Sequence, residues 1–545
     1  MICDAARKYR GKTAFIRRAD DGSKENVSYI QLKEYYYRLS TFLLDNGFAG
    51  ARIAVTGKNC CEWVISYLAA ATVGVAVPID KELKKNDIEE FLKAAKCRML
   101  ISDGKTEVPE CEGVVCADFA QIYSLASGGK YGFAGYGGEN ARTDGAAVDA
   151  IKLPKDRMQV LIFTSGTTGS SKGVCLSQYN VCSNIHSTVS VVRVTPRDVT
   201  LSILPLHHTY ECTLNCLLLL SRGACITYVS GLRRIASDIR EYRPTILVVV
   251  PAVLKLLDSR IKAGIIKDCP EKYREHFENL PLCEALGKLP LLVRGVIKSK
   301  VRATLGGRMR LFIVGAADLD TVLVRDFSAL GIRTLQGYGL TECSPLVAGN
   351  SDFYFNAAST GIAIPGVRIK IENPNEEGVG EILAKGDNVM LGYYNDEAAT
   401  ERVLRGGWFH TGDLGYMDPS DGALYIRGRI KNVIVTPNGK NVYPEELETR
   451  LGDRPEIKES LVLAAKGDDN AKVKAKILPD LEYLKEKFGR EVTAGEIKEA
   501  VKAAVAEVNA QMPQYKHIDA VEILSRPLER TTTQKILRFG ANVEQ

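Results

Sequence analysis

The stretch that most constrains this chain is MQVLIFTSGTTGSSKGV, residues 158–174. Its apolar run Val160–Phe163 is short and continuous, which is typical of a strand buried on both faces of a sheet. The run ends in hydroxyl-bearing residues, glycines and Lys172. Glycines let backbone N–H groups approach an anion, hydroxyls donate hydrogen bonds, and an ammonium group adds a point charge. The stretch predicts a phosphate-binding loop after a buried strand, with a spacing that differs from the Walker pattern G-x-x-x-x-G-K-S/T. An unliganded turn is the alternative.

Length and composition indicate an ordinary globular protein of two or more domains. The 545 residues are 45% hydrophobic and 25% charged, and the net charge of +6 is too mild to indicate nucleic-acid binding. All fourteen cysteines lie between Cys3 and Cys343 without paired C-x-x-C sets. No signal peptide precedes Cys3, so we expect reduced thiols and a cytoplasmic location. The longest apolar stretches, 212–220 and 246–257, are too short or interrupted to span a bilayer.

One segment, residues 288–310, is strongly basic. It contains seven Lys or Arg residues and no acid, with Leu and Val interleaved. Such a segment could make peripheral contact with anionic lipid. The alternative, which composition favours, is a solvated helix face that covers the core.

Strand-like and helix-like segments alternate through the first 340 residues, which predicts α/β layering. Ser28 and Gly47 are suitable caps for a helix over 29–46, and a second helix is expected over 62–72. Short apolar runs bounded by polar residues predict buried parallel strands at 52–56, 74–79, 98–102, 201–206, 225–229, 245–250 and 311–314.

The texture changes after Glu342, where short strands and turns predict a small β subdomain. From about Lys431 onward the signals are those of a separate α+β domain on a short linker. Asn438-Gly439 predicts a hairpin, Pro444 suits the first turn of a helix, and Thr493-x-x-Glu496 is a capping box. The strands expected in the β subdomain are 361–371, 380–384 and 423–427.

Several widely spaced motifs together resemble the adenylate-forming (AMP-binding) superfamily of acyl-CoA synthetases. They occur in that family's order and cover nearly the whole chain. The closest likeness is to long-chain fatty acid–CoA ligases, through LPLHHTYE, LGGRMRLFIVGAADL and ALGIRTLQGYGLTECSP. The superfamily motifs are FTSGTTGSSKG (163–173), LPLHH (204–208), QGYGLTE (336–342), GEI (380–382), MLGYY (390–394), GWFHTGD (407–413), GRIKN (428–432) and TTTQKILR (531–538).

The resemblance implies an architecture and a reaction. An AMP-binding domain would span 1–428, with layered α/β subdomains and a small β subdomain, followed by a hinge at 429–433 and a mobile α+β domain at 434–545. A fatty acid would attack the α-phosphate of ATP and release pyrophosphate, and the thiol of coenzyme A would then take the acyl group. ATP, Mg²⁺ and coenzyme A are the cofactors implied, and the fatty acid and coenzyme A are the small-molecule partners.

The resemblance also assigns the phosphate-binding residues. Thr341 matches the family's α-phosphate position and Glu342 its magnesium position, and a single carboxylate suits Mg²⁺. The residues implied for the β- and γ-phosphates are Thr164, Ser165, Gly166, Thr167, Thr168, Gly169 and Lys172.

Adenine and ribose are assigned to other motifs. Tyr338 offers a flat face for adenine, and its flanking glycines allow close approach. Asp413 would accept both ribose hydroxyls, with Arg429 as a second ribose contact. The remaining nucleotide-site residues implied are Gln336, Gly337, Gly339 and Gly315, and Gly315, Ala316 and Ala317 are expected to line the acyl channel and adenine pocket.

Two residues are implied as catalytic besides Thr341 and Glu342. His208 would lie beside the carboxylate and α-phosphate, whereas its neighbour His207 is expected to be structural. Lys535 would deliver its ammonium group to the first half-reaction. Rotation at Lys431 would replace it with the loop that holds Gly439, which would open a channel for the thiol.

Departures from the family pattern and other functions stay open at this point. Gln534 and Ser171 stand where glycine and proline are common, and VGAADL replaces the commoner GGAPL, which could alter chain-length preference. One alternative is transfer to an acyl carrier protein, and another is activation of a different carboxylic acid. A nucleotide-binding regulatory protein without turnover is disfavoured, because the reacting groups are all present.

Overall fold

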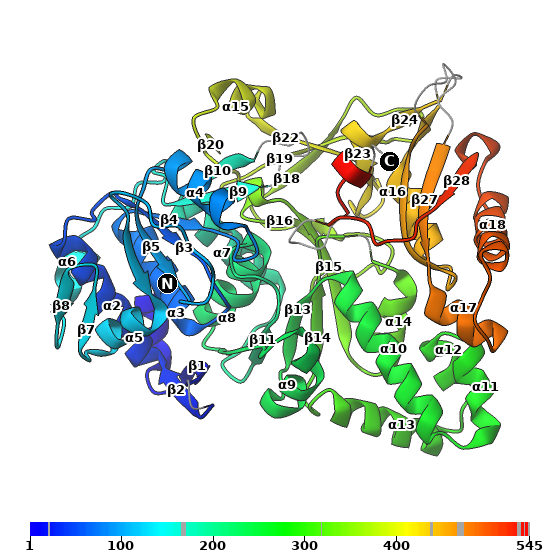
Figure 1. Ribbon diagram of the computed structural model, residues 1–545, viewed down its shortest axis with the longest axis horizontal. Helices are drawn as coiled ribbons and strands as arrows, with labels where there is room; N and C mark the ends of the chain where they lie inside the picture. The colour runs from blue at the N-terminus through cyan, green and yellow to red at the C-terminus, as the bar shows by residue number, and fades with distance from the viewer. Residues whose placement is uncertain are drawn as a thin grey trace. The chain divides into compact units, whose positions relative to one another are not determined.

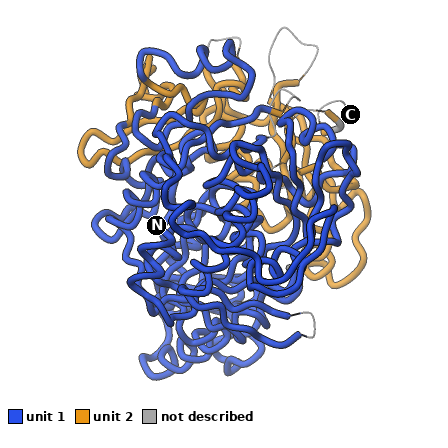
Figure 2. Tube along the Cα trace, turned by 90° about the vertical axis from the view of Figure 1, so that its left-hand side faces the viewer, with its two compact units in different colours: residues 1–164, 172–368, 384–407 blue, residues 165–171, 369–383, 408–545 orange. Residues whose placement is uncertain are grey.

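The computed structural model describes residues 1–19, 22–164, 171–317, 319–436, 440–465, 473–530, 536–538 and 540–542. The chain forms two compact units, coloured separately in Figure 2. Unit 1 consists of residues 1–164, 172–368 and 384–407, and unit 2 of residues 165–171, 369–383 and 408–545. The expected domain boundaries, with a hinge at 429–433, stay a prediction.

A seven-stranded sheet lies in the first half of unit 1. Its strand order is β20-β10-β9-β4-β3-β5-β6. The β9–β4–β3–β5–β6 pairs are parallel, and β10 pairs antiparallel with both β9 and β20. The strands are β3 (Arg52–Val55), β4 (Val75–Pro78), β5 (Cys97–Ser102), β6 (Val115–Asp118), β9 (Val160–Thr164), β10 (Lys172–Leu176) and β20 (Gly392–Tyr393).

A layer of helices covers this sheet (Figure 1). The helix cap expected at Ser28 is present at the start of α2, where Ser28 and Gln31 form a capping box and satisfy each other's backbone N–H groups. Between α5 and α6, β7 (Tyr131–Phe133) and β8 (Tyr136–Gly138) form a small antiparallel hairpin. The helices of this part are α1 (Ile2–Tyr9), α2 (Tyr29–Asp45), α3 (Cys61–Val73), α4 (Lys85–Ala94), α5 (Phe119–Ser127), α6 (Gly145–Asp149) and α7 (Gln178–Val191).

The second sheet of unit 1 has nine strands in the order β17-β16-β15-β14-β13-β11-β12-β1-β2. Its central pairs are parallel and the edge pairs antiparallel. The strand expected over 201–206 ends at Ser202. The strands are β1 (Thr13–Arg18), β2 (Lys24–Ser28), β11 (Val199–Ser202), β12 (Cys225–Tyr228), β13 (Ile246–Val249), β14 (Leu311–Val314), β15 (Arg333–Gly339), β16 (Leu346–Gly349) and β17 (Ile362–Ala363).

Helices that follow β12, β13 and β14 pack on one core with this sheet. That core is built from apolar side chains of β11, β13 and β14 together with those of the helices. Among the described residues no helix is both long and apolar enough to cross a bilayer. The helices are α8 (Leu218–Ser221), α9 (Ile235–Tyr242), α10 (Pro251–Asp268), α11 (Glu271–Asn279), α12 (Leu282–Gly287), α13 (Leu291–Thr304) and α14 (Thr321–Ala329); α15 (Glu397–Val403) comes later.

Unit 2 begins with a β subdomain and ends with an α+β fold. In the β subdomain, β18 (Arg368–Glu372), β19 (Gly380–Lys385) and β22 (Trp408–Met417) lie in one sheet, and β23 (Leu424–Arg429) pairs antiparallel with β22. The short strand β21 (Leu404–Arg405) belongs to unit 1. In unit 2, β24 (Ile434–Val435) pairs antiparallel with β25 (Asn441–Val442). Asn438 and Gly439, the expected turn, lie outside the described residues.

The last part of unit 2 places helices against a three-stranded sheet. Pro444 occupies the first turn of α16, and Thr493 and Glu496 form the capping box of α18, as expected. Val501, Val505 and Val508 are buried in the core of this part. The elements are α16 (Pro444–Gly452), β26 (Ile457–Ala464), β27 (Val473–Pro479), α17 (Leu481–Phe488), α18 (Ala494–Ala510) and β28 (Ala520–Ile523).

Candidate functional site

The glycine- and hydroxyl-rich loop joins two antiparallel strands. Thr164 ends β9 and Lys172 begins β10, and the two residues are cross-strand partners. The Thr164 hydroxyl donates to the carbonyl oxygen of Lys172 over 3.3 Å. The ends of the loop are therefore held side by side. The loop residues Ser165, Gly166, Thr167, Thr168 and Gly169 lie outside the described residues.

Lys172 and Glu342 both contact one tyrosine, Tyr393: the lysine lies over its ring and the glutamate accepts from its hydroxyl. The strand pairing of β20 with β10 brings Tyr393 opposite Val174. The Lys172 ammonium lies 4.6 Å from the centroid of the Tyr393 ring, and the Tyr393 hydroxyl donates to Glu342 Oε1 over 2.9 Å. Burial, with the charge of Glu342 as a second cause, raises the pKa of Tyr393 well above its usual range. The structure thus brings the predicted cation and the predicted magnesium ligand together.

The sequence reasoning gave Tyr393 no role. The residue lies within the MLGYY motif, so the motif was the signal that could have found it. The backbone N–H of Met390, from the same motif, donates to the carbonyl oxygen of Glu342 over 2.7 Å. The motif therefore supports the glutamate through both its backbone and its side chain.

The QGYGLTE motif spans the end of β15 and a 3₁₀ turn, Thr341–Cys343. Tyr338 and the side chains of Thr341 and Glu342 are half-buried. A Cβ on Gly339 would lie 2.1 Å from the Pro345 carbonyl oxygen, and one on Gly337 would lie 2.8 Å from Leu346 Cδ1. Gly339 is therefore required by the backbone of Pro345, whereas a side chain at position 337 would only require the Leu346 side chain to move.

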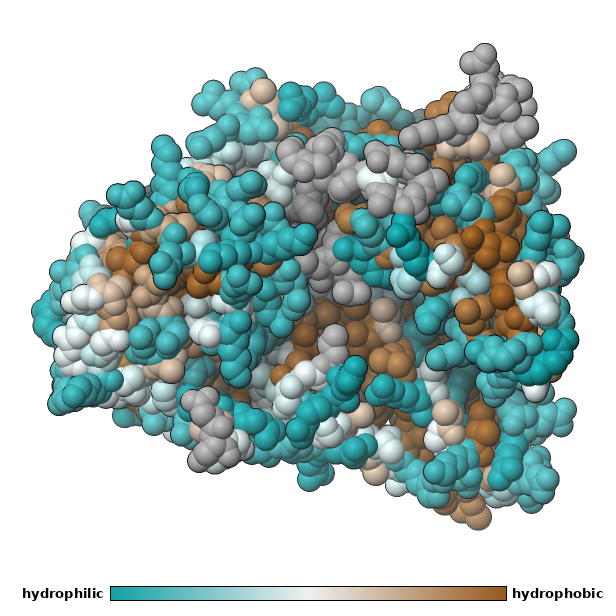
Figure 3. All heavy atoms as spheres, in the orientation of Figure 1, coloured by the Kyte–Doolittle hydropathy of each residue, from teal (hydrophilic) through white to brown (hydrophobic). Residues whose placement is uncertain are grey.

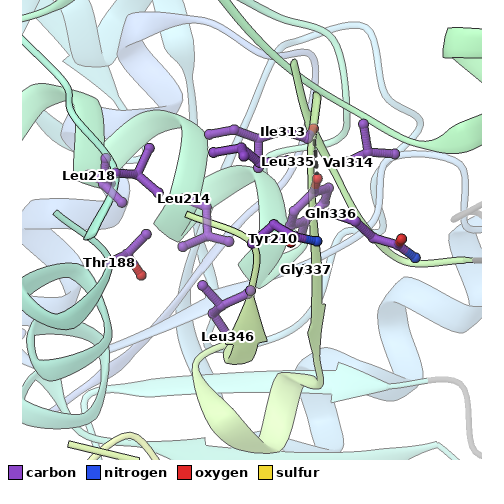
Figure 4. Close-up of a pocket in the computed structure, with 13 residues that line it drawn as sticks. Thr188, Tyr210, Leu214, Leu218, Ile313, Val314, Leu335, Gln336, Gly337 and Leu346 are labelled. Atoms are coloured by element: carbon purple, nitrogen blue, oxygen red, sulfur yellow. Dashed lines mark hydrogen bonds between the residues drawn. The ribbon is translucent and has the colours of Figure 1, made fainter. Parts of the chain in front are cut away.

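An apolar cavity of about 30 Å³ borders the same strand. Figure 4 shows Tyr210 between the helical segment that carries Leu214 and the strands that carry Ile313 and Leu335. The Tyr210 hydroxyl, a single donor, lies within hydrogen-bond distance of the carbonyl oxygens of Val249 (3.2 Å) and Ile313 (3.1 Å). The full lining is Thr188, Val192, Tyr210, Leu214, Leu218, Ile313, Val314, Leu335, Gln336, Gly337, Leu346, Gly349 and Asn350.

The predicted channel residues Gly315, Ala316 and Ala317 directly follow the cavity-lining Val314. A Cβ on Gly315 would lie 3.2 Å from the Tyr210 ring, so glycine at this position makes room for the tyrosine. Ala316 and Ala317 are exposed. Their role in an acyl channel stays a prediction.

The two histidines of LPLHH lie ring to ring, with centroids 3.9 Å apart. His207 is almost fully buried, which lowers its pKa to about 3, so it is neutral at pH 7. Its Nε2 lies 3.4 Å from Asp80 Oδ2 without hydrogen-bond geometry. His208 is half-buried. A neutral, buried His207 agrees with the expected structural role. The catalytic role of His208 stays a prediction.

A buried polar network holds the turn that carries these histidines. Asn59 donates to the Leu204 carbonyl oxygen over 2.6 Å and accepts from the Leu206 N–H over 3.1 Å. Asn59 also donates to the Ser202 hydroxyl (2.9 Å), which itself donates to Glu211 Oε1 (2.5 Å). Because Leu204 and Leu206 bond to a side chain, the chain leaves the sheet after Ser202. Sequence reasoning missed Asn59, for which no local signal exists.

Glu211 lies in a π-helix, Tyr210–Leu217, directly after the histidines. Its side chain is fully buried, and Oε1 also accepts from the Asn215 amide over 2.7 Å. Burial raises the pKa of Glu211 to about 8, so the group is mostly protonated at pH 7. π-Helical segments are frequent at functional sites, and this one begins two residues after His208.

In unit 2, Asp413 and Arg429 form the expected pair. They are cross-strand partners on β22 and β23, and Arg429 Nε lies 2.9 Å from Asp413 Oδ1. Asp413 is buried, with 7% of its side chain exposed, whereas Arg429 is 43% exposed. The arrangement presents a fixed carboxylate with a cation beside it, which suits vicinal hydroxyl groups.

Glu381 of the GEI motif supports the loop that carries Asp413. Its Oε2 lies 2.9 Å from His410 Nδ1, and its Oε1 accepts from the Gly412 N–H over 3.1 Å. The Thr411 hydroxyl donates to the Ile382 carbonyl oxygen and accepts from the Asp413 N–H. Glu372 lies farther from His410 Nδ1, at 3.7 Å. Both carboxylate oxygens of Glu381 thus have partners in the loop that carries Asp413. Sequence reasoning did not assign this supporting role to Glu381.

The hinge and C-terminal predictions are described only in part. Lys431 lies in a 3₁₀ turn, Ile430–Asn432, and is exposed. Gly439 and Lys535 lie outside the described residues. Arg538 pairs with Glu448 and donates to the Val462 carbonyl oxygen, so the chain just after Lys535 is anchored within unit 2.

Layered α/β sheets, a nucleotide-type motif at the end of β15 and a fixed Asp–Arg pair define a nucleotide-binding enzyme fold. The AMP-binding enzyme family matches residues 3–394, and the chain belongs to that family. The α/β fold expected from the motifs is confirmed.

Similar proteins of known name agree with this assignment. Long-chain-fatty-acid–CoA ligase 5 of Rattus norvegicus is 29% identical over 463 residues, which cover 77% of this chain and 66% of the relative. Long-chain-fatty-acid–CoA ligase 1 of Cavia porcellus is 30% identical over 472 residues, covering 79% and 66%. The chain thus spans just under two thirds of the length of these relatives.

A solved structure shares the fold over almost the whole chain. The o-succinylbenzoate CoA synthetase MenE of Bacillus subtilis, in complex with ATP and magnesium ion, superposes with a TM-score of 0.72 at 22% identity. The match covers 98% of each chain. This likeness concerns the fold alone.

Proposed function

We propose that this protein is an ATP-dependent, AMP-forming ligase that activates a long-chain fatty acid and transfers it to coenzyme A. One observation carries the proposal. Strand β15 lines an apolar cavity with Leu335 and Gln336, and the same strand continues into Tyr338, next to Thr341 and Glu342. An apolar acid bound there would have its carboxylate end toward the nucleotide motif. The names of the relatives support the choice of a fatty acid and of coenzyme A.

The first half-reaction would depend on fixed charges. As phosphoryl chemistry spreads negative charge over oxygen atoms, catalysis is mainly electrostatic positioning. Lys172 would hold the leaving pyrophosphate together with Thr164 and the hydroxyls of the loop. His208 would orient the attacking carboxylate. Its neighbour His207 is held neutral by burial and would therefore add no charge of its own beside it.

Glu342 fits the magnesium role proposed for it. A carboxylate is the type of ligand that Mg²⁺ prefers, and the metal would neutralise phosphate charge when bound. The Tyr393 hydrogen bond and the Met390 N–H bond fix the orientation of Glu342 before any ligand arrives.

The remaining roles are proposed by the same reasoning. Asp413 and Arg429 would hold the ribose hydroxyls, with Tyr338 against adenine. Lys535 would complete the first half-reaction, and rotation at Lys431 would exchange it for the Gly439 loop before the thiol attacks. The cavity has a volume of only about 30 Å³, so a long acyl chain would enter as Tyr210 and its π-helix move.

The deciding experiment is ATP–pyrophosphate exchange over a panel of carboxylic acids from medium to long chain, including aromatic acids. We expect exchange with long-chain fatty acids. In a second step the adenylate is offered coenzyme A or a holo acyl carrier protein, and we expect acyl-CoA. Exchange with no fatty acid would overturn the acyl assignment, and transfer only to the carrier protein would replace coenzyme A as acceptor.

The matched variant is Lys535→Ala. It should abolish exchange but spare thioester formation from pre-made acyl-adenylate, because the lysine would act in the first half-reaction alone. An equal loss of both activities would contradict the two-orientation mechanism.

A further inference from the structure

Helix α13 turns one face to the core of unit 1. Ile297 and Val301 are buried in the cluster that also contains side chains of α9 and α10. This face accounts for the covering role that composition favoured for residues 288–310. It leaves the opposite side of the helix to be explained.

The opposite side of α13 carries large apolar side chains in solvent. Leu291 is 77% exposed, Leu292 86% and Val296 57%. Leu292 and Val296 are four residues apart, so they lie one above the other on one helix face. Figure 3 shows hydrophobic atoms interrupting the hydrophilic surface at the lower right edge, where Figure 1 draws α13. Single exposed leucines are ordinary, whereas adjacent ones on one helix mark an interaction surface.

Basic side chains flank this apolar group. Lys298, Lys300 and Arg302 follow it along the helix, and residues 288–310 contain no acid. From the neighbouring helix α10, Asp268 Oδ2 lies 3.7 Å from Lys300 Nζ, and both side chains are 61% exposed. This pair offsets only one of the seven basic side chains of residues 288–310, so the segment keeps a net positive charge.

We propose that α13 docks onto an anionic lipid bilayer. Leu291, Leu292 and Val296 enter the interface between headgroups and acyl chains, and the basic residues contact lipid phosphates. Amphipathic helices with basic polar faces bind membranes in this manner, parallel to the surface.

Charge and area favour a membrane over a protein partner. A second copy docked face to face would place like charges against each other, because a two-fold interface joins identical patches. Three exposed apolar side chains also offer far less area than the roughly 800 Å² per partner of a stable protein interface. A bilayer needs neither shape complementarity nor a large patch.

The proposal does not depend on the proposed ligase activity, since it concerns binding alone. The experiment is flotation of the full-length protein with phosphatidylcholine vesicles, with and without phosphatidylglycerol. We expect flotation with the anionic vesicles, decreasing as salt is raised because the charges are screened. Equal flotation with neutral vesicles, or none with either, would overturn the proposal.

Two sets of variants localise the contact. Replacing Leu291, Leu292 and Val296 together by Ser should lower vesicle partitioning by about tenfold or more, as should replacing Lys298, Lys300 and Arg302 together by Gln. The matched control is Phe353→Ser, because Phe353 is an apolar residue of unit 1 with 82% exposure and should leave binding unchanged. Unchanged partitioning of both triple variants would assign binding to another surface.

A third variant reports insertion directly. Leu292→Trp, added to a chain with two native tryptophans, should shift its emission to shorter wavelength on addition of anionic vesicles. No shift beyond that of the wild type would contradict insertion. A concentration-dependent dimer lost in the Ser variant, without vesicle binding, would assign the face to a second copy instead.

Discussion

The hydroxyl group of Tyr393 donates a hydrogen bond of 2.9 Å to Oε1 of Glu342. The ammonium group of Lys172 lies over the same ring, 4.6 Å from the ring centroid. One tyrosine therefore touches the end of the phosphate-type loop and the carboxylate proposed to hold Mg²⁺. Groups that orient a metal-ligating carboxylate typically change metal affinity or activity by about 10- to 100-fold when removed.

The first prediction concerns this tyrosine. Tyr393→Phe keeps the ring beneath Lys172 and removes only the hydrogen bond to Glu342. We expect ATP–pyrophosphate exchange to need about tenfold more Mg²⁺ for half-maximal rate, with part of the activity restored at high Mg²⁺. The measurement is exchange rate against Mg²⁺ concentration. Tyr394→Phe is the control, and an unchanged Mg²⁺ profile for Tyr393→Phe would contradict the positioning role.

The second prediction concerns the support of Asp413. Glu381→Ala removes the partner of His410 and of the Gly412 N–H, and a buried polar group left unpaired costs about 1–3 kcal/mol. We expect a lower melting temperature and a raised KM for ATP. Glu372→Ala is the control, since Glu372 lies 3.7 Å from the same nitrogen and should have a smaller effect. Equal effects of the two substitutions would contradict a distinct role for Glu381 and would show that Glu372 and Glu381 hold His410 equally.

The local elements could be predicted from sequence because their signals are local. The Ser28 helix cap, the Thr493 capping box and the Pro444 helix start were all expected and are present. The strand expected over 201–206 was too long. Its backbone leaves the sheet after Ser202, where the backbone groups of Leu204 and Leu206 bond to the side chain of Asn59, which is distant in sequence.

The candidate site could be predicted only where a motif carries the residue. The Asp413–Arg429 pair follows from two motifs whose strands are paired. Tyr393 lies in the MLGYY motif, which marks the segment, but the contact of Tyr393 with Glu342 depends on the long-range pairing of β20 with β10, which the motif does not reveal. The π-helix that carries Glu211 contains one extra residue per turn, which hydrophobic periodicity does not reveal.

The third prediction concerns chain length. Tyr210→Ala removes the ring that fills one side of the cavity, so longer acids should gain relative to shorter ones. Each methylene that newly fits should change kcat/KM by about tenfold or more. The measurement is kcat/KM across the fatty-acid panel. Tyr210→Phe is the control, because it loses the bonds to Val249 and Ile313 but keeps the ring. The same profile for Ala and wild type would place the acyl chain elsewhere.

The fourth prediction concerns pH and the buried carboxyl of Glu211. Its pKa is raised from 4.5 to about 8 by burial, so between those values the folded state keeps a proton that the unfolded state releases. Stability should therefore fall as pH rises through this window, by up to about 1.4 kcal/mol per pH unit. Below pH 4.5 both states are protonated and the dependence disappears.

Glu211→Gln tests this dependence, because glutamine keeps an oxygen acceptor for Ser202 and Asn215 but carries no proton to release. Between pH 6 and pH 8 the melting temperature of the wild type should fall more steeply than that of the variant, while the exposed Glu278→Gln should follow the wild type. Hydrogen bonds through Ser202 and Asn59 connect Glu211 to the turn that carries His208. Loss of the folded-state proton of Glu211 should therefore also lower exchange activity above pH 8 in the wild type but not in the variant. If the melting temperatures of the wild type and Glu211→Gln change equally with pH across this range, the Glu211 carboxyl is ionised in the folded protein. Another group would then carry the pH dependence of stability.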